Sequence, residues 1–227
     1  MKFLVFLTVL LGGAVSACAD TEFASIISNG DFAPGPCPSA PEACVAPWFA
    51  TYGQGAAIPG WTVTWGTVDW IGKYWQAPPG GGFSIDLDGW WPGGISQTVD
   101  TVPGQHYVLS FYLAGNPDGA PDRKQVLVSV GALSFPYSPP KSPSRTDMEW
   151  SLETLGFTAT ELSTTISFTS EDTNSPYGPA LGGVSLIDPP VPVPEPGFYA
   201  ECGSMGLLLA GFWWWSRPAL QAKKQSQ

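Results

Sequence analysis

The sequence predicts an all-β fold, a β-sandwich or a barrel, for the long middle part of the chain. From Phe23 to Asp188, apolar and polar residues alternate in short runs, as in strands that bury one face. Gly, Pro, Asn and Asp separate these runs, and no window offers twelve residues at helical spacing. We therefore expect about eight to ten short strands, and about 165 residues suit one domain rather than two.

The first 19 residues are typical of a secretory signal peptide. Lys2 precedes the apolar stretch Phe3–Leu11, which is too short to span a bilayer, and small residues follow as far as Ala19. We expect cleavage after Ala19, so residues 20–188 form the exported domain. The alternative is a lipoprotein signal, in which Cys18 becomes the lipidated first residue.

Two cysteines lie in a Pro-rich segment near the start of this domain. Cys18 belongs to the signal peptide and Cys202 to the apolar C-terminal segment, which leaves Cys37 and Cys44 as a pair in an oxidising compartment. We expect a disulfide between them that closes a surface loop.

Seven runs have the clearest period of two. We expect Trp61, Trp65 and Trp150 to pack in the core, because they alternate in phase with Val63 and Leu152. The predicted strands are Trp61–Trp65, Phe83–Leu87, Ile95–Val99, His106–Leu113, Gln125–Val130, Ser151–Thr158 and Ser163–Thr169.

The segment from Asp69 to Trp91 combines aromatic rings with amide and carboxylate groups. Sugars bind to such sets, since flat rings stack on the apolar face of a pyranose and polar groups bond its hydroxyls. Trp90 and Trp91 lie in a Gly-rich turn where both rings cannot turn inward, so at least one is expected to be exposed. The candidate carbohydrate-binding residues are Trp70, Tyr74, Trp75, Gln76, Asp86, Asp88, Trp90 and Trp91.

Composition excludes several other functions. The chain has 9 Lys and Arg against 19 Asp and Glu, a net charge of −10, which disfavours nucleic-acid binding. His106 is the only histidine, no Gly-x-Ser-x-Gly turn presents a nucleophile, and no zinc ligand set is present. We expect no enzyme activity; a glycoside hydrolase would have to use Asp69, Asp86 and Asp88.

Two short polar motifs have structural interpretations. Asn116-Pro-Asp-Gly119 is typical of a turn, and Arg145 could form an ion pair with Asp147.

The C-terminal segment has three parts. Residues 189–196 form a stiff Pro-rich linker, and residues 197–216 form an apolar stretch long enough for a transmembrane helix of about 30 Å. A basic tail with Arg217, Lys223 and Lys224 completes residues 197–227 and would stay on the cytoplasmic side of the membrane.

This arrangement resembles the PEP-CTERM sorting signal of Gram-negative bacteria. Pro194, Glu195 and Pro196 form its motif, followed by the apolar helix and the basic end. The resemblance implies anchoring in the inner membrane and processing by an exosortase. Glu201 within the helix and the diluted basic end depart from the family pattern.

The middle part resembles the choice-of-anchor C family and the related domain-of-unknown-function group 642, which includes plant cell-wall proteins. The resemblance implies a galactose-binding-like jelly roll and a non-catalytic, polysaccharide-binding role. It rests on the segments Asn29–Phe32, Ala57–Val63, Val68–Ile71, Tyr74–Ala77, Ser84–Gly89, Pro92–Thr98, Leu113–Gly119, Ser144–Met148 and Tyr177–Leu181.

The last predicted strand departs from that family. The chain has Gly182-Gly183-Val184 where the family has Asp-Asn-Val, and related jelly rolls use an acidic residue there for a structural calcium ion. Two side-chain oxygens are lost, so calcium is not favoured, and we expect no cofactor.

These features together predict a non-enzymatic protein at the cell surface or in the extracellular matrix, exported from a Gram-negative bacterium, that binds polysaccharide. Two alternatives stay open. One is a purely structural matrix protein with protein partners, and the other is a glycoside hydrolase.

Overall fold

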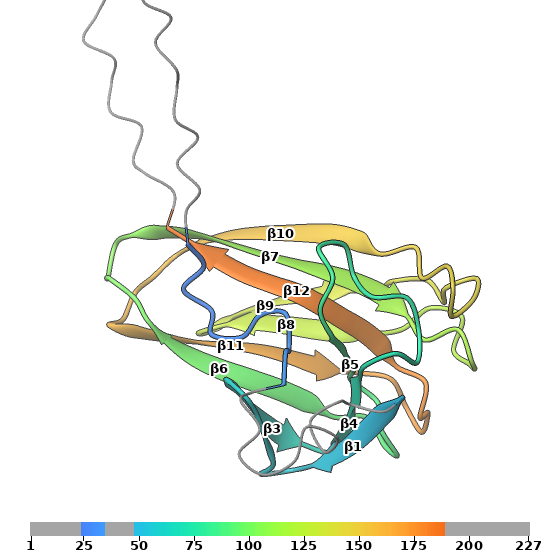
Figure 1. The fold of residues 1–227 in the computed structure, drawn as a ribbon. Coiled ribbons are helices and arrows are strands. Elements are labelled where there is room, and N and C mark those ends of the chain that lie inside the picture. Colours follow the sequence, from blue (N-terminus) through green and yellow to red (C-terminus); the bar gives the residue numbers. More distant parts are fainter. Residues whose placement is uncertain (1–23, 35–47, 189–227) are drawn as a thin grey trace, which may run out of the picture. The chain divides into compact units, whose positions relative to one another are not determined.

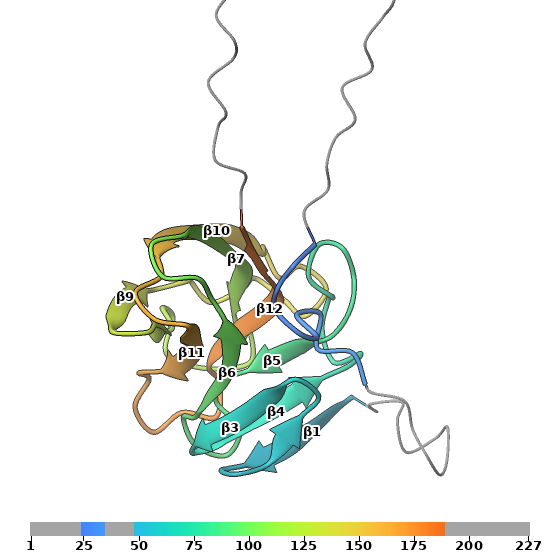
Figure 2. The ribbon, with the colours of Figure 1, turned by 90° about the vertical axis from the view of Figure 1, so that its left-hand side faces the viewer.

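The computed structural model describes residues 24–34 and 48–188, which form a sandwich of two antiparallel six-stranded sheets. Figure 1 shows the sheets in profile, and Figure 2 shows them from one end. The first sheet consists, in order, of β1 (Phe49–Gly53), β4 (Thr67–Ile71), β5 (Ser84–Asp86), β12 (Pro179–Ile187), β7 (His106–Gly115) and β10 (Ser151–Thr158). The second consists of β2 (Ala57–Ile58), β3 (Trp61–Trp65), β6 (Gly94–Asp100), β11 (Ser163–Ser170), β8 (Val126–Val130) and β9 (Leu133–Tyr137).

The predicted all-β sandwich is confirmed, and the period-two runs are its strands. β3 and β10 have the predicted bounds, and the other five runs differ by a few residues at their ends. The expected number of strands was too low, since the described residues form twelve. β12 was expected only through the family resemblance and not from a period-two run, because its first half is buried on both faces and contains two glycines, so it does not alternate.

The main core lies between the sheets and is built from their inward-facing residues. Phe111 of β7 and Phe168 of β11 meet edge to face across the core with ring centroids 5.1 Å apart. Both rings are fully buried, and Leu109, Ile95 and Val128 surround them. Truncation of such a ring costs about 3–5 kcal/mol, so this contact anchors one sheet to the other.

A second, smaller core lies on the outer face of the first sheet. Ile71 and Ala180 project from β4 and β12 on this side, and Trp75 and Met148 cover them from two loops. The Trp75 indole donates a 2.8 Å hydrogen bond to the Ser84 hydroxyl. Loops are therefore packed firmly over this face.

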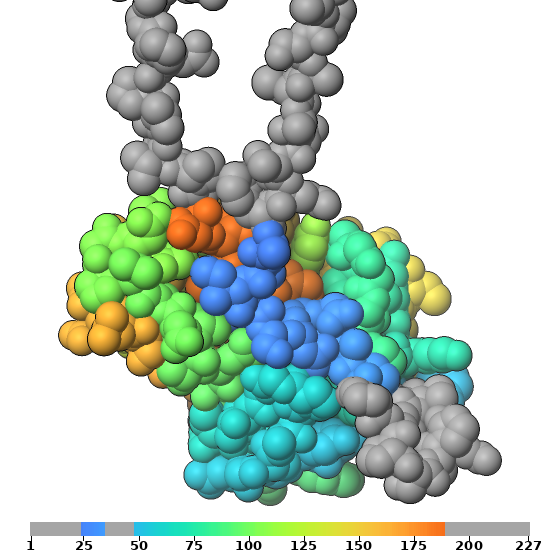
Figure 3. All heavy atoms as spheres, turned by 60° about the vertical axis from the view of Figure 1, so that its left-hand side comes forward, coloured from blue at the N-terminus to red at the C-terminus, as the bar shows by residue number. Residues whose placement is uncertain are grey.

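The N-terminal segment 24–34 closes one edge of the sandwich. In Figure 3 it runs as a blue band across the surface beside the orange C-terminal strand. Ile26 donates its backbone N–H to Leu186 of β12, and the Trp61 indole of β3 donates to the carbonyl of Asn29. Because these bonds reach both sheets, the segment links the sheets at their edge. Phe32 is completely buried at the end of this segment.

The three tryptophans expected in the core have different surroundings. Trp61 is 2% exposed, which confirms the prediction, and Trp150 is half-buried. Trp65 is 42% exposed, so that prediction was wrong. The pairing of β3 with β6 shifts register between Val63 and Trp65, and this irregularity interrupts the alternation on which the prediction rested.

Several predictions concern residues outside the described ranges. These are the signal peptide with Cys18, the Cys37–Cys44 disulfide, the motif Pro194, Glu195 and Pro196, and the apolar segment 197–216. Within residues 24–34 and 48–188, no helix is long and apolar enough to cross a membrane.

Candidate binding site on the outer face of the first sheet

A pocket of about 260 Å³ opens on the outer face of the first sheet, where loops cover β1, β4 and β5. We call it the central pocket. Its lining residues are Phe49, Thr51, Asp69, Tyr74, Trp75, Asp86, Gly89, Trp90, Asn116, Asp118, Pro176 and Tyr177.

A row of polar side chains on neighbouring strands contributes to the pocket. Thr51 is paired with Asp69 in register, and Asp69 is paired with Asp86. Since paired residues point to the same face of a sheet, the three side chains lie side by side about 5 Å apart. Their outward direction follows from the alternation of each strand, because Val68 and Ile85 point into the main core.

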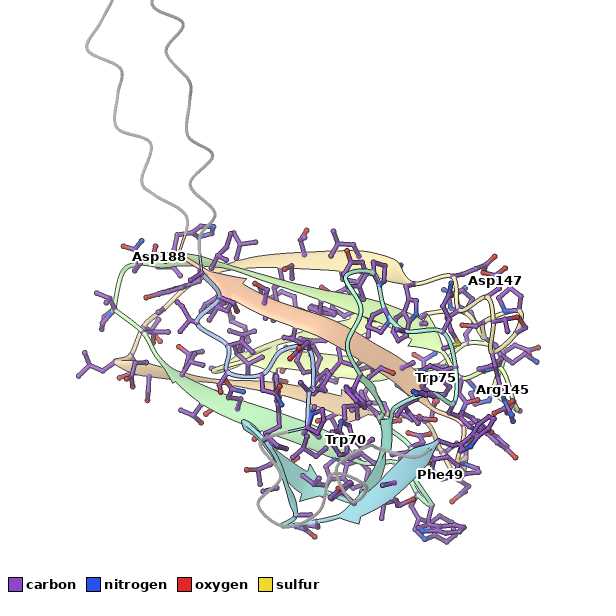
Figure 4. The ribbon with its side chains drawn as sticks, in the orientation of Figure 1. Phe49, Trp70, Trp75, Arg145, Asp147 and Asp188 are labelled. Atoms are coloured by element: carbon purple, nitrogen blue, oxygen red, sulfur yellow. The ribbon has the colours of Figure 1, made fainter. Side chains whose placement is uncertain are left out.

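Aromatic rings form the walls. Phe49 is 43% exposed, Tyr177 is 37% exposed and Trp90 is 71% exposed. Tyr74 meets Phe49 edge to face at a centroid distance of 5.3 Å. Figure 4 places Phe49, Trp75 and Arg145 toward the same end of the sandwich, while Asp188 lies at the opposite end.

The turn Asn116–Gly119 joins the pocket floor to its walls. The Asn116 amide donates to Asp86 Oδ2 at 2.6 Å, and its Oδ1 accepts the backbone N–H of Asp118 at 2.9 Å. Asp118 Oδ2 in turn accepts the Tyr74 hydroxyl at 2.8 Å. Any Cβ at Gly119 would approach the Tyr177 ring to 2.1 Å, so only glycine allows this ring to pack on the turn.

Arg145 is paired with Asp118 and not with Asp147, which corrects the prediction. Its Nε donates to Asp118 Oδ1 at 2.8 Å, and its guanidinium carbon lies 4.0 Å from the centroid of the Tyr74 ring. Asp147 belongs to a tight turn in which its backbone pairs with Ser144. The Arg145 side chain therefore holds Tyr74 and Asp118 together at the pocket rim.

The carboxylates of the pocket differ in how far their hydrogen-bonding capacity is used. Asp86 is buried and accepts hydrogen bonds from the Asn116 amide and from the backbone N–H groups of Asp88 and Gly178. Burial is the largest effect on its pKa and raises it well above the usual value. Asp69 is half-buried and accepts one hydrogen bond, from the Thr51 hydroxyl at 2.5 Å. Burial also raises the pKa of Asp69.

Asp88 lies outside the pocket lining and is completely buried. Neither of its carboxylate oxygens has a hydrogen-bond partner among the described residues. Burial raises the pKa of Asp88 to about 7, and the nearby Ser170 hydroxyl and Lys124 ammonium lower this pKa. Neither group makes a hydrogen bond to the Asp88 carboxylate. Lys124 is buried too and donates to the carbonyl of Gly119 at 2.9 Å, within the turn that supports the pocket.

The structure brings together some of the predicted site residues. Tyr74, Trp75, Asp86 and Trp90 all line the central pocket. Trp90 and Trp91 are both largely exposed, which confirms the expectation for that turn. Trp91 is 62% exposed but does not line the pocket, and its backbone is held by two 3.0 Å hydrogen bonds with the Thr67 hydroxyl.

Other predicted site residues do not line the central pocket. Trp70 is 7% exposed, packs in the main core and donates its indole N–H to the carbonyl of Phe32 at 2.8 Å. Its ring is therefore not available to a sugar in this arrangement. Gln76 accepts the backbone N–H of Met148 at 2.8 Å and borders a neighbouring hollow. Asp88 is completely buried and does not line the pocket.

The lining also includes Phe49, Asn116, Asp118 and Tyr177, which were not candidate site residues in the sequence. Three of them lie in segments that carry the family resemblance, at Leu113–Gly119 and Tyr177–Leu181. The polar and aromatic residues of these two segments were therefore the available signal. Their convergence with Asp69 depends on strand order in the first sheet, which no local pattern encodes.

The glycines that replace the expected calcium ligands have a structural role. Gly183 has a φ of 54°, and a Cβ at Gly182 would approach the Pro78 side chain to 2.6 Å. These residues provide no side-chain oxygen, so the ligands do not fit a calcium ion there. No group of three or more His, Cys, Asp or Glu is arranged to hold a metal ion within the part of the chain that the structure describes.

The pocket is better suited to binding than to acid–base catalysis. Asp69 and Asp86 lie next to each other on paired strands of the sheet, whereas the two carboxylates of a glycosidase flank the scissile bond. His106 is the first residue of β7, and Asn116 follows the end of that strand. At about 3.3 Å per residue the two are roughly 30 Å apart along the strand, out of reach of a ligand in the pocket.

Comparison with known proteins gives a family match. The family model described as "Protein of unknown function (DUF642)" matches residues 25–187. Halomucin of Haloquadratum walsbyi is 34% identical over 141 residues, which is 60% of this chain and 1% of halomucin. The chain therefore corresponds to a very small part of that relative.

Among solved structures, the similar chains have low identity. A CBM4 structure is 16% identical with a TM-score of 0.39, over 72% of this chain and 99% of that one. A family 16 carbohydrate-binding module is 17% identical with a TM-score of 0.38, over 53% of this chain and 84% of that one. A family GH115 4-O-methyl-α-glucuronidase is 12% identical with a TM-score of 0.38, over 48% and 15% of the respective chains.

Proposed function

The chain belongs to the DUF642 family of proteins of unknown function, and we propose that its sandwich domain binds an extracellular or cell-wall polysaccharide without altering it. The central pocket is the proposed site. The observation that carries the proposal is the convergence of exposed rings with carboxylate and amide groups over a rigid sheet face.

Each part of the pocket suits a sugar ring. Trp90, Phe49 and Tyr177 offer apolar surfaces for the C–H face of a pyranose, and Asp69 keeps a carboxylate oxygen that no described residue bonds. The Asn116–Gly119 turn and Arg145 hold the rim in place, so little conformational freedom is lost on binding.

A binding role without catalysis fits the hydrogen bonds of Asp86. Three donors already occupy this carboxylate, so it positions the turn and is not free to transfer a proton to a substrate. Asp69 alone does not form the pair of carboxylates that glycoside hydrolysis needs.

We place this domain at the cell surface or in the extracellular matrix, consistent with the exported, choice-of-anchor and PEP-CTERM features of the sequence. An exosortase-type enzyme and the inner membrane would be its partners during processing. Asp188, the last described residue, lies at the end of the sandwich opposite Arg145 (Figure 4).

Retention of the purified protein on insoluble polysaccharides tests the proposal. Cellulose, xylan, chitin and the host's own exopolysaccharide are suitable probes, with wild type and the Trp90→Ala and Trp91→Ala variants compared. We expect Trp90→Ala to lose about 10- to 100-fold in affinity, because it removes a pocket wall. Trp91→Ala is the matched control, since this neighbouring ring is also largely exposed but lies outside the pocket.

Three outcomes would contradict the proposal. Retention of neither wild type nor variants on any probe would favour a structural matrix role with protein partners. Equal retention of all three forms would place the site elsewhere. Release of reducing sugar that Asp69→Asn abolishes would identify a hydrolase.

A further inference from the structure

Two larger hollows adjoin the central pocket, and each shares a different pair of residues with its lining. The Arg145 hollow, of about 520 Å³, shares Tyr74 and Trp75 with the pocket. The Arg123 hollow, of about 550 Å³, shares Pro176 and Tyr177 with it. The central pocket alone lies below the range of about 300 to 1,000 Å³ that is typical of ligand clefts, so it has room for about one sugar ring.

From this arrangement we propose that the protein binds the interior of an extended polysaccharide chain, in a groove of three consecutive subsites. The proposal rests on the function proposed above and specifies its ligand. The central pocket takes one unit, and the chain continues past Tyr74 into one hollow and past Tyr177 into the other.

The two tyrosines are suited to act as dividing platforms. The Tyr74 hydroxyl bonds Asp118 and its ring lies under the Arg145 guanidinium, while the Tyr177 ring rests on Gly119. Both are therefore held by the same turn, and neither ring is free to swing across the groove. A chain end does not need openings on both sides of the pocket, whereas a chain interior does.

The Arg145 hollow provides further surface for a sugar. Trp48 is 64% exposed and meets Tyr74 edge to face at a centroid distance of 6.5 Å. Lys73 and Gln76 add polar groups to the same hollow, and Trp150 anchors Gln76 by an indole hydrogen bond of 3.1 Å to its carbonyl.

The Arg123 hollow is more polar. Arg123 donates to the Ser138 carbonyl at 2.6 Å, and Asp172 accepts the backbone N–H of Gln125 at 2.8 Å, so both walls are held in place. Exposed side chains such as Thr173 and Asn174 lie along its rim. Sugar hydroxyls would find donors and acceptors there.

The lining also constrains the charge of the central unit. It contains Asp69, Asp86 and Asp118 and no Lys or Arg. A uronic acid in this position would place its carboxylate beside these three side chains, and Arg145 at the rim is already paired with Asp118. We therefore assign the central subsite to a neutral or amino sugar.

The test is a chain-length series measured by calorimetry on the full-length protein. The probes are cello-, xylo- and chito-oligosaccharides from the monosaccharide to the hexasaccharide, with oligogalacturonates as the anionic series. We expect affinity in at least one uncharged or amino series to rise by about tenfold or more between the disaccharide and the hexasaccharide. Oligogalacturonates should bind at least about tenfold more weakly.

Blocking variants locate the flanking subsites. Thr146→Trp fills the Arg145 hollow and Thr173→Trp fills the Arg123 hollow, and both residues are exposed, so folding should be retained. Each should reduce hexasaccharide affinity by about tenfold and leave disaccharide affinity within about twofold. Thr165→Trp, on the outer face of the second sheet, is the matched control and should change neither.

The outcomes separate the two proposals. Affinity that no longer rises beyond the disaccharide, or blocking variants that match the control, would overturn the groove and leave pocket binding intact. Binding of no series would overturn both. Tightest binding to oligogalacturonates would contradict the charge assignment.

Discussion

The two outer faces of the sandwich carry rows of polar side chains with the same spacing but very different surroundings. On the first sheet, Thr51, Asp69 and Asp86 lie side by side in the central pocket. On the second sheet, a row of hydroxyls crosses five strands in register, through Thr62, Ser96, Ser167, Ser129 and Ser134.

Loops account for the difference. The first row is covered by Trp75, Trp90 and the turn Asn116–Gly119, which convert a polar strip into a pocket and bury Asp86. The second row pairs with itself, as in the 2.9 Å contact between the Ser129 and Ser134 hydroxyls, and these side chains face solvent. The polar row on the first sheet therefore becomes part of a pocket because loops enclose it and desolvate its groups.

Among the substitutions that compare the two faces, removal of the Asp86 carboxylate should have the largest effect on stability. Asp86→Ala leaves the Asn116 amide and two backbone N–H groups without an acceptor in a buried region. We expect a loss of about 3–5 kcal/mol in unfolding free energy, measured by urea denaturation. Ser167→Ala, at a row position of the second sheet, should cost less than about 0.5 kcal/mol. Equal losses would mean that the enclosed row is no more constrained than the open one.

Asp88→Asn should produce the next largest effect, and with a dependence on pH. Burial raises the pKa of Asp88 to about 7 from 3.8, so the folded protein holds a proton that the unfolded chain releases. Stability should therefore be greatest below about pH 4 and fall as the pH rises toward 7. The Asn variant should be more stable than wild type at pH 8 by about 2–4 kcal/mol and should lack this part of the pH dependence.

A variant at a charged neighbour of Asp88 provides a second test of the pH dependence. Asp172 raises the Asp88 pKa and Lys124 lowers it, and Asp86 carries a raised pKa of its own. Lys124→Met should therefore make the loss of stability between pH 4 and pH 7 steeper in wild-type Asp88 protein. A pH profile of Asp88→Asn that superimposes on wild type would show that Asp88 is not the group that titrates.

The Arg145 contact should have a smaller effect. Arg145 is 45% exposed at its side chain, and an ion pair of this kind contributes about 1 kcal/mol or less to stability. Arg145→Ala should therefore weaken sugar binding, by loosening Tyr74 and Asp118, more than it lowers the melting temperature. Asp147→Ala is the control and should leave both quantities unchanged, unless Arg145 pairs with Asp147 in solution.

The sequence predicts the sandwich well because the alternation that identifies each strand is a local property of the sequence. Alternation in Trp61–Trp65 and Ser151–Thr158 identifies β3 and β10, and the turn chemistry around Trp90 and Trp91 indicates their exposure. β12 has no such signal, since Gly182 and Gly183 interrupt its alternation and it is buried on both faces at its start.

The site was predicted in part, for a physical reason. Trp70 and Trp90 are the same residue type in one segment, yet Trp70 occupies the core-facing side of β4 and Trp90 lies at the pocket wall. Asp118 and Tyr177 reach the pocket only because β12 begins beside β5 and β7 ends beside the start of β12 in the first sheet. Such long-range neighbours depend on strand order, which alternation does not report.

Substitution on the open face should have the smallest effect. Thr165→Val removes the 2.8 Å contact between the Thr98 and Thr165 hydroxyls and keeps a β-branched side chain. We expect a change of less than about 0.5 kcal/mol in stability and none in polysaccharide retention. A loss of retention would indicate that the second sheet takes part in binding.

Titration of the isotopically labelled protein with an oligosaccharide, followed by amide NMR shifts, compares the two faces directly. The account predicts shifts at Asp69, Trp90, Asn116, Asp118 and Tyr177, and none along the hydroxyl row from Thr62 to Ser134. Shifts confined to the second sheet, or spread equally over both faces, would contradict it.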